Sequence, residues 1–241
     1  ARNELVDHSA VAQSIQDGWL KYYSDELPSK DNPLLAIEET IFTGHVGGST
    51  NIAQNKLAEN THLILRNVIH SLVSGKQLLQ ESEGYKLNII NERLKNNRVY
   101  KPRSGKTDKV RVLLTDIFNL EILDFSSLEK LGAQIEIKDV SDDVLTSEKL
   151  EKIMREFKPH VLLIRSKKEP IKNIVKLADE IEDFSYLIRP GVGIDNIHPV
   201  LRGLDKRGVI ILNEPNGNIS SVAEMCTHFL LNSVKNVILA P

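Results

Sequence analysis

The stretch Val161-Leu-Leu-Ile164 is an unbroken apolar run, which is typical of a strand buried on both faces of a parallel sheet. Four further β-rich runs lie around it, at 110–114, 134–137, 186–188 and 209–212. Amphipathic helical patterns fill the intervals between them, and alternating strands and helices predict parallel βαβ units. Residues 109–218 are therefore predicted to form an α/β domain with a flavodoxin-like, doubly wound parallel sheet.

The composition is that of an ordinary globular protein. The 241 residues are 41% hydrophobic and 27% charged, and the formal net charge is −2. This balance gives no global attraction to nucleic acid or to an anionic membrane, so a small-molecule partner is predicted. The single cysteine, Cys226, cannot form an intrachain disulfide. Since no signal-peptide pattern, membrane-spanning run or metal-ligand spacing is visible, we predict a cytoplasmic protein without a metal site.

Two long helices are predicted outside this domain. Residues 49–74 have apolar side chains at helical spacing, with Ser49 or Thr50 as the cap and Gly75 as the stop. The second helix begins near Ser220 or Ser221 and runs to about Ala240. Its apolar residues cover more than one face, so it either packs against two partners or is buried within its own domain.

The segment 77–108 between the first helix and the sheet is polar and charged, which predicts a linker. Its end, Lys101-Pro-Arg-Ser-Gly-Lys106, has the basic and small residues of a phosphate-binding loop. It lacks the first glycine of a P-loop, which favours the linker.

Several linked motifs lie in the C-terminal half: Leu163-Ile-Arg-Ser166, the stretch LIRPGVGIDNI at 187–197, the stretch RGVIILNEPNG at 207–217, and Ser221-Val-Ala-Glu224. Together they resemble the substrate domain of D-2-hydroxyacid dehydrogenases of the phosphoglycerate dehydrogenase type. The resemblance spans roughly residues 110–240. It implies hydride transfer between NAD and a D-2-hydroxy acid, with 3-phosphoglycerate, the substrate of serine biosynthesis, as the expected acid. It also implies a homodimer.

A second resemblance lies at the N-terminal end. Ala1-Arg-Asn-Glu-Leu-Val-Asp7 and the stretch FTGHVGGST at 42–50 resemble segments that, in the family, follow the NAD-binding core. Here these segments come first, and no GxGxxG loop for the pyrophosphate occurs anywhere in the chain. A circular permutation, a cut from a tandem fusion or a missing middle segment would each give this order.

The resemblance implies a five-part organisation. The parts are a C-terminal fragment of a Rossmann-type NAD-binding domain (1–50), a crossover helix (51–76), the linker (77–108), the substrate-binding domain (109–218) and an interdomain or dimer helix (219–241).

The resemblance also assigns roles to individual residues. His45 matches the acid/base, Glu26 its carboxylate partner and Arg2 the arginine that binds the substrate carboxylate and carbonyl. Asp25 is retained on the cofactor side because a second register of this segment is possible. The implied substrate-binding residues are Arg165, Ser166, Val192, Gly193 and Asn213, and the implied cofactor-binding residues are Asp25, Gly47, Gly48 and Ser221.

Each assignment has a structural alternative. Gly191 and Gly193 could serve only a turn, Arg165 could pair with a neighbouring acid, and Arg2 could fray at its chain end. The other histidines match no motif and are expected to be structural or surface residues. For the whole chain, the alternative function is a non-catalytic module that binds a small acid or mediates dimerisation.

Overall fold

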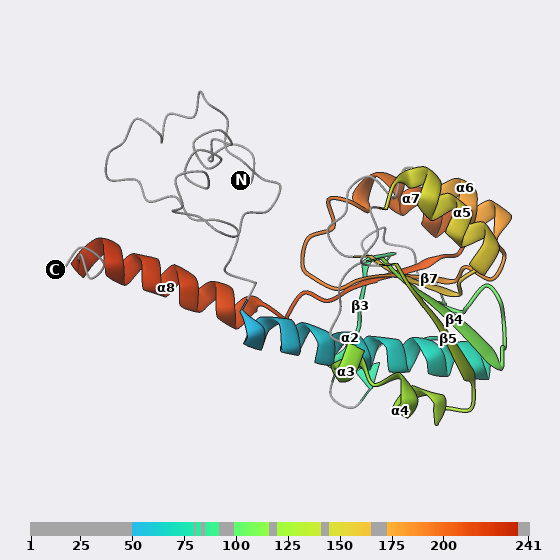
Figure 1. Ribbon diagram of the computed structural model, residues 1–241, viewed down its shortest axis with the longest axis horizontal. Helices are drawn as coiled ribbons and strands as arrows, with labels where there is room; N and C mark the ends of the chain where they lie inside the picture. Colours follow the sequence, from blue (N-terminus) through green and yellow to red (C-terminus); the bar gives the residue numbers. More distant parts are fainter. Residues whose placement is uncertain are drawn as a thin grey trace. The chain divides into compact units, whose positions relative to one another are not determined.

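The computed structural model describes residues 50–79, 81–82, 85–91, 99–115, 120–140, 145–164 and 173–235 (Figure 1). The chain divides into two compact units. The larger unit is 54–217, and the smaller unit combines 1–53 with 218–241. The larger unit contains the sheet and the candidate site.

The larger unit is built on a six-stranded, mostly parallel sheet, which confirms the predicted α/β class. Its strands are β3 (Asn88–Ile89), β4 (Lys109–Leu114), β5 (Gln134–Asp139), β6 (Val161–Leu163), β7 (Tyr186–Arg189) and β8 (Ile210–Asn213). Their order is β3-β8-β7-β6-β4-β5, and only β3 runs antiparallel to its neighbour. The five parallel strands have the 2-1-3-4-5 order compatible with a flavodoxin-like fold, whose switch point lies between β4 and β6.

Helices cover both faces of this sheet (Figure 1). On one face are α5 (Ser147–Phe157), α6 (Ile174–Glu180), the 3-10 helix η4 (His198–Val200) and α7 (Leu201–Lys206), and on the other are α2 (Asn51–Ser74), α3 (Leu120–Leu123) and α4 (Phe125–Glu129). A hydrophobic core lies on each face of the sheet, and the strand side chains alternate between these two cores. Leu162 faces the core under α5, α6 and α7, and its neighbour Leu163 faces the core under α2. Both side chains are fully buried, which explains the unbroken apolar runs in the sequence.

Side-chain caps and glycine set the ends of the longer helices. Thr50 Oγ1 accepts a hydrogen bond from Ala53 N at 3.1 Å, which confirms Thr50 as one of the two predicted caps of α2. The helix ends before Gly75, whose φ of +65° is in the left-handed region, as predicted. None of the helices in the described part of the chain combines the length and apolarity needed to cross a bilayer.

The segment 77–108 differs from the predicted linker, because it contains β1 (Glu81–Ser82), β2 (Tyr85–Lys86) and β3. Asn88 pairs with Asn213 and Ile89 with Leu212, so β3 forms one edge of the sheet. The side chains of Leu87, Ile89 and Ile90 are buried. Polar residues surround this short apolar strand, so an interpretation based on composition did not detect it.

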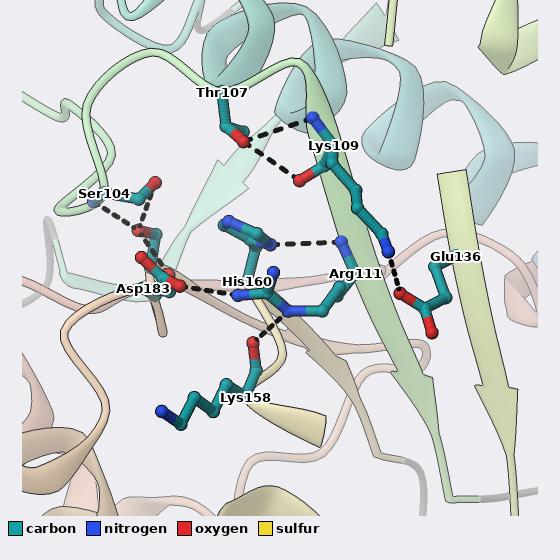
Figure 2. A network of polar contacts seen from close by, with 9 residues as sticks. Ser104, Thr107, Lys109, Arg111, Glu136, Lys158, His160 and Asp183 are labelled. Atoms are coloured by element: carbon teal, nitrogen blue, oxygen red, sulfur yellow. Dashed lines mark hydrogen bonds and ion pairs between the residues drawn. The ribbon is translucent and has the colours of Figure 1, made fainter. Parts of the chain in front are cut away.

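A polar network at the amino edge of the sheet centres on His160 (Figure 2). Its ring Nδ1 accepts a hydrogen bond from Arg111 N at 3.0 Å, which requires this nitrogen to be unprotonated. The Arg111 guanidinium donates to Lys158 O at 2.6 Å and to Asp183 Oδ2 at 2.5 Å. Burial, and then the charge of Arg111, lower the pKa of His160 to about 4, although the charge of Asp183 acts in the opposite direction.

His160 is therefore expected to make stability depend on pH between about 6.5 and 4. In this window the unfolded chain protonates His160 and the folded chain does not, so the free energy of unfolding falls as the pH falls. The shift from 6.5 to about 4 corresponds to roughly 3 kcal/mol in total. Urea unfolding at a series of pH values should show this loss in the unsubstituted chain and a much smaller one in His160→Asn. Equal slopes in the two proteins across this window would contradict the assignment.

Candidate functional site

The carboxyl edge of the sheet is the candidate site, because open α/β sheets bind ligands outside the carboxyl ends of their strands. At the switch point Thr115, directly after β4, is fully buried, and its Oγ1 donates to Leu163 O of β6 at 3.0 Å. Farther along the same edge, β7 is followed by the turn Pro190–Gly193 and β8 by Glu214. Side-chain hydrogen bonds connect β7, β8 and β3 along this edge.

The turn after β7 has a backbone that only glycine accommodates. Gly191 has a φ of +131°, a conformation that residues with a side chain rarely adopt. A Cβ on Gly191 would lie 2.3 Å from Arg189 Nη1, so the guanidinium of Arg189 lies directly against this residue. The glycine therefore permits the turn and also admits a cation beside it.

Asn213, at the end of β8, holds the turn. Its side-chain Nδ2 donates to Gly191 O at 3.2 Å and to Val192 O at 3.0 Å. Asn88 of β3 in turn donates from its Nδ2 to Asn213 Oδ1. Asn213 is fully buried, so both ends of its amide are committed to protein partners.

These hydrogen bonds fix the direction of two backbone amides. In a trans peptide the carbonyl of one residue and the N–H of the next point in opposite directions. Because the carbonyls of Gly191 and Val192 both face Asn213, the N–H groups of Val192 and Gly193 face away from it. Within the part of the chain that the structure describes, neither N–H donates to a protein acceptor. The turn thus presents two adjacent donors beside the guanidinium of Arg189, an arrangement suited to an anion.

Glu214, which directly follows β8, fixes the end of this strand through the hydrogen bonds of its carboxylate. Its carboxylate is fully buried and accepts hydrogen bonds from Asn60 Nδ2 at 2.9 Å, Asn216 N at 2.9 Å, Gly217 N at 2.5 Å and Tyr85 Oη at 3.2 Å. Burial raises the pKa of Tyr85, and the charge and hydrogen bond of Glu214 raise it further, so the hydroxyl stays protonated and donates. Four donors satisfy the buried carboxylate and tie α2 and β2 to the site.

Three of the predicted site residues come together in this arrangement, namely Val192, Gly193 and Asn213. Ser221 lies in α8 (Ile219–Lys235) of the smaller unit, where its Oγ is 2.8 Å from Thr50 Oγ1. The remaining predicted residues lie outside the described part of the chain: Arg2, Asp25, Glu26, His45, Gly47, Gly48, Arg165 and Ser166. Their roles stay predictions.

The sequence interpretation missed Arg189, Asn88 and Glu214. A signal for Arg189 was available, since a cation directly before Pro-Gly-Val-Gly at the end of a predicted strand lies where ligands bind. Asn88 and Glu214 had no such signal. Their side-chain partners are 125 to 154 residues away in sequence, so only the folded chain brings these side chains together.

The carboxyl edge of this open α/β sheet thus carries a turn with two backbone donors that have no described protein acceptor, next to the arginine Arg189. Comparison with known proteins finds two distant relatives. The chain is similar to a D-3-phosphoglycerate dehydrogenase of Archaeoglobus fulgidus, with 26% identity over 129 residues, and to one of Methanocaldococcus jannaschii, with 28% identity over 128 residues. Each match covers 53% of this chain and 22% of the relative. No family model matches the chain. These distant similarities support a relation to 2-hydroxyacid dehydrogenases.

Proposed function

We propose that the chain is the substrate-binding part of an NAD-dependent dehydrogenase that acts on a D-2-hydroxy acid, with 3-phosphoglycerate as the preferred substrate. The observation that carries the proposal is the turn held by Asn213, in which the N–H groups of Val192 and Gly193 point away from Asn213 and the Arg189 guanidinium lies against Gly191. The reaction type is inferred from the two dehydrogenases to which the chain is similar.

In this proposal the substrate carboxylate binds at the turn. Its oxygens accept hydrogen bonds from the two backbone N–H groups, and the Arg189 guanidinium adds a positive charge nearby. Backbone donors held by a buried side chain lose little freedom on binding, so they orient the carboxylate at low entropic cost. A carboxylate fixed at two points also fixes the adjacent carbon, where the hydroxyl is oxidised.

The catalytic roles proposed for His45, Glu26 and Arg2 rest on the sequence resemblance. Histidine suits the transfer of the hydroxyl proton, a neighbouring carboxylate stabilises the charged imidazole, and arginine binds the developing carbonyl. The described residues do not fit a complete NAD site. The sequence has no GxGxxG loop to hold the pyrophosphate, and the Oγ of Ser221 already contacts Thr50.

This arrangement predicts that the 241-residue chain binds a small hydroxy acid but binds NADH weakly. Isothermal titration with D-glycerate is expected to give a dissociation constant of about 1 mM, equivalent to about 4 kcal/mol. Titration with NADH, followed by its fluorescence, is expected to show no binding in the micromolar range because the pyrophosphate loop is missing. Tight NADH binding would contradict the second half of the prediction, and acetate binding as well as D-glycerate would argue against a hydroxy-acid site.

A non-catalytic assembly module is the second candidate, favoured by the apolar surface of α8. The side chains of Ile219, Val222, Leu230 and Leu231 are between 41% and 65% exposed, although aliphatic residues are usually buried. In this alternative α8 pairs with a second copy while the larger unit captures a small acid. A chain that sediments as a monomer at high concentration would count against pairing, and a His45→Gln variant with unchanged activity would favour the non-catalytic role.

A further inference from the structure

We propose that Asn88, on the antiparallel edge strand β3, is a positioning residue for the carboxylate-binding turn. This inference rests on the proposed function, because it concerns how the amides of that site are oriented. Asn88 lies opposite Asn213 in the β3–β8 register, and its side-chain Nδ2 donates to Asn213 Oδ1. Among the described residues, its side chain is hydrogen-bonded to Asn213 and not to the turn itself.

The chemistry of the Asn213 amide explains why this donor matters. An asparagine side chain presents an acceptor oxygen on one side and a donor nitrogen on the other. Because Asn88 supplies a donor to the oxygen, the nitrogen of Asn213 is directed at the carbonyls of Gly191 and Val192. A reversed amide would place its oxygen against those two carbonyl oxygens and leave both of them unsatisfied.

Two side chains, those of Asn88 and Asn213, couple the edge strand β3 to the orientation of the backbone amides at the ligand site. Asn88 orients the Asn213 amide, and Asn213 holds the carbonyls of Gly191 and Val192. In these trans peptides the N–H groups of Val192 and Gly193 therefore point away from Asn213. Since Asn213 is fully buried, its oxygen has little access to water that could replace Asn88. The edge strand, which comes from the polar segment 77–108, thereby completes a site on the parallel strands.

Two substitutions separate this role from a general effect on folding. Asn88→Ala removes the donor without adding charge. Asn88→Asp has the same shape but presents only acceptor oxygens to Asn213 Oδ1, so it favours the reversed amide. Asn55→Asp, on an exposed position of α2, is the matched control because it adds the same charge on the surface.

The test is a nuclear magnetic resonance titration of the full chain with D-glycerate, monitoring the backbone amides of Val192 and Gly193. In the unsubstituted chain both resonances are expected to shift on binding. In Asn88→Ala the dissociation constant is expected to rise about five- to tenfold, the scale of one lost hydrogen bond, and the same two resonances should already differ before ligand is added. Asn88→Asp should raise it more than tenfold, and Asn55→Asp should leave it within twofold.

The outcomes separate the two proposals. If the unsubstituted chain shows no shift with D-glycerate, the proposed function fails, and the inference fails with it. If the unsubstituted chain binds and Asn88→Ala binds equally well with unchanged Val192 and Gly193 resonances, only the positioning role of Asn88 is overturned. A lower unfolding midpoint in Asn88→Ala with unaltered binding would show a purely structural role and would also overturn it.

Discussion

Replacement of Glu214 by alanine is expected to lower the free energy of unfolding by about 3–5 kcal/mol, because it leaves a buried cluster of donors without an acceptor. The carboxylate is fully buried and accepts from Asn60, Tyr85 and the N–H groups of Asn216 and Gly217. Removing it would also release the links from α2 and β2 to the end of β8. The loss therefore combines unpaired polar groups with a cavity.

Urea unfolding of three proteins tests this expectation. Glu214→Gln keeps the size of the side chain but exchanges one acceptor oxygen for a donor, so an intermediate loss of about 2 kcal/mol is expected. Glu156→Ala is the control, since Glu156 is exposed on α5 and its only described partner, Lys152, is 3.9 Å away. An exposed pair of this kind contributes less than about 0.5 kcal/mol. The assignment fails if Glu214→Ala unfolds at the same urea concentration as Glu156→Ala.

The parallel sheet could be predicted because a strand that is buried on both faces appears in the sequence as an unbroken apolar run. Val161, Leu162 and Leu163 pack alternately into the two cores, so no polar residue interrupts the run. At the sheet edge the sequence of β5 instead alternates the apolar residues Ile135 and Ile137 with polar ones, although Ile137 is 39% exposed. The position of Gly75 at the end of α2 was predictable for a similar local reason.

The polar half of the site could not be predicted, because its contacts are not local. Asn88 meets Asn213 across 125 residues, and Asn60 meets Glu214 across 154. Nothing near Glu214 in the sequence distinguishes a buried carboxylate from one exposed in a turn, and most glutamates are exposed. The pairing of β3 with β8 brings Asn88 to Asn213, and two paired residues are too short a strand for a period to be visible. The position of α2 brings Asn60 to Glu214.

Replacement of Gly191 by alanine is expected to weaken D-glycerate binding by more than about tenfold and to lower the free energy of unfolding by about 1–3 kcal/mol. Two effects act together. A φ of +131° is strained for any residue with a side chain, and the new Cβ would lie 2.3 Å from Arg189 Nη1. Either the turn must change, which would disturb the N–H groups of Val192 and Gly193, or the Arg189 guanidinium must move, which would take its positive charge away from the turn.

Gly105→Ala provides the comparison that separates strain from site geometry. Gly105 also has a positive φ, +67°, but a Cβ there would meet no atom within 4 Å. This variant should lose about 1 kcal/mol of stability from backbone strain and should bind D-glycerate as the unsubstituted chain does. If Gly191→Ala lost stability to the same extent but kept its affinity, the turn would be structural only. A loss of affinity in Gly191→Ala that Gly105→Ala does not share would instead support binding of the acid at the turn, since the two glycines also differ in what surrounds them.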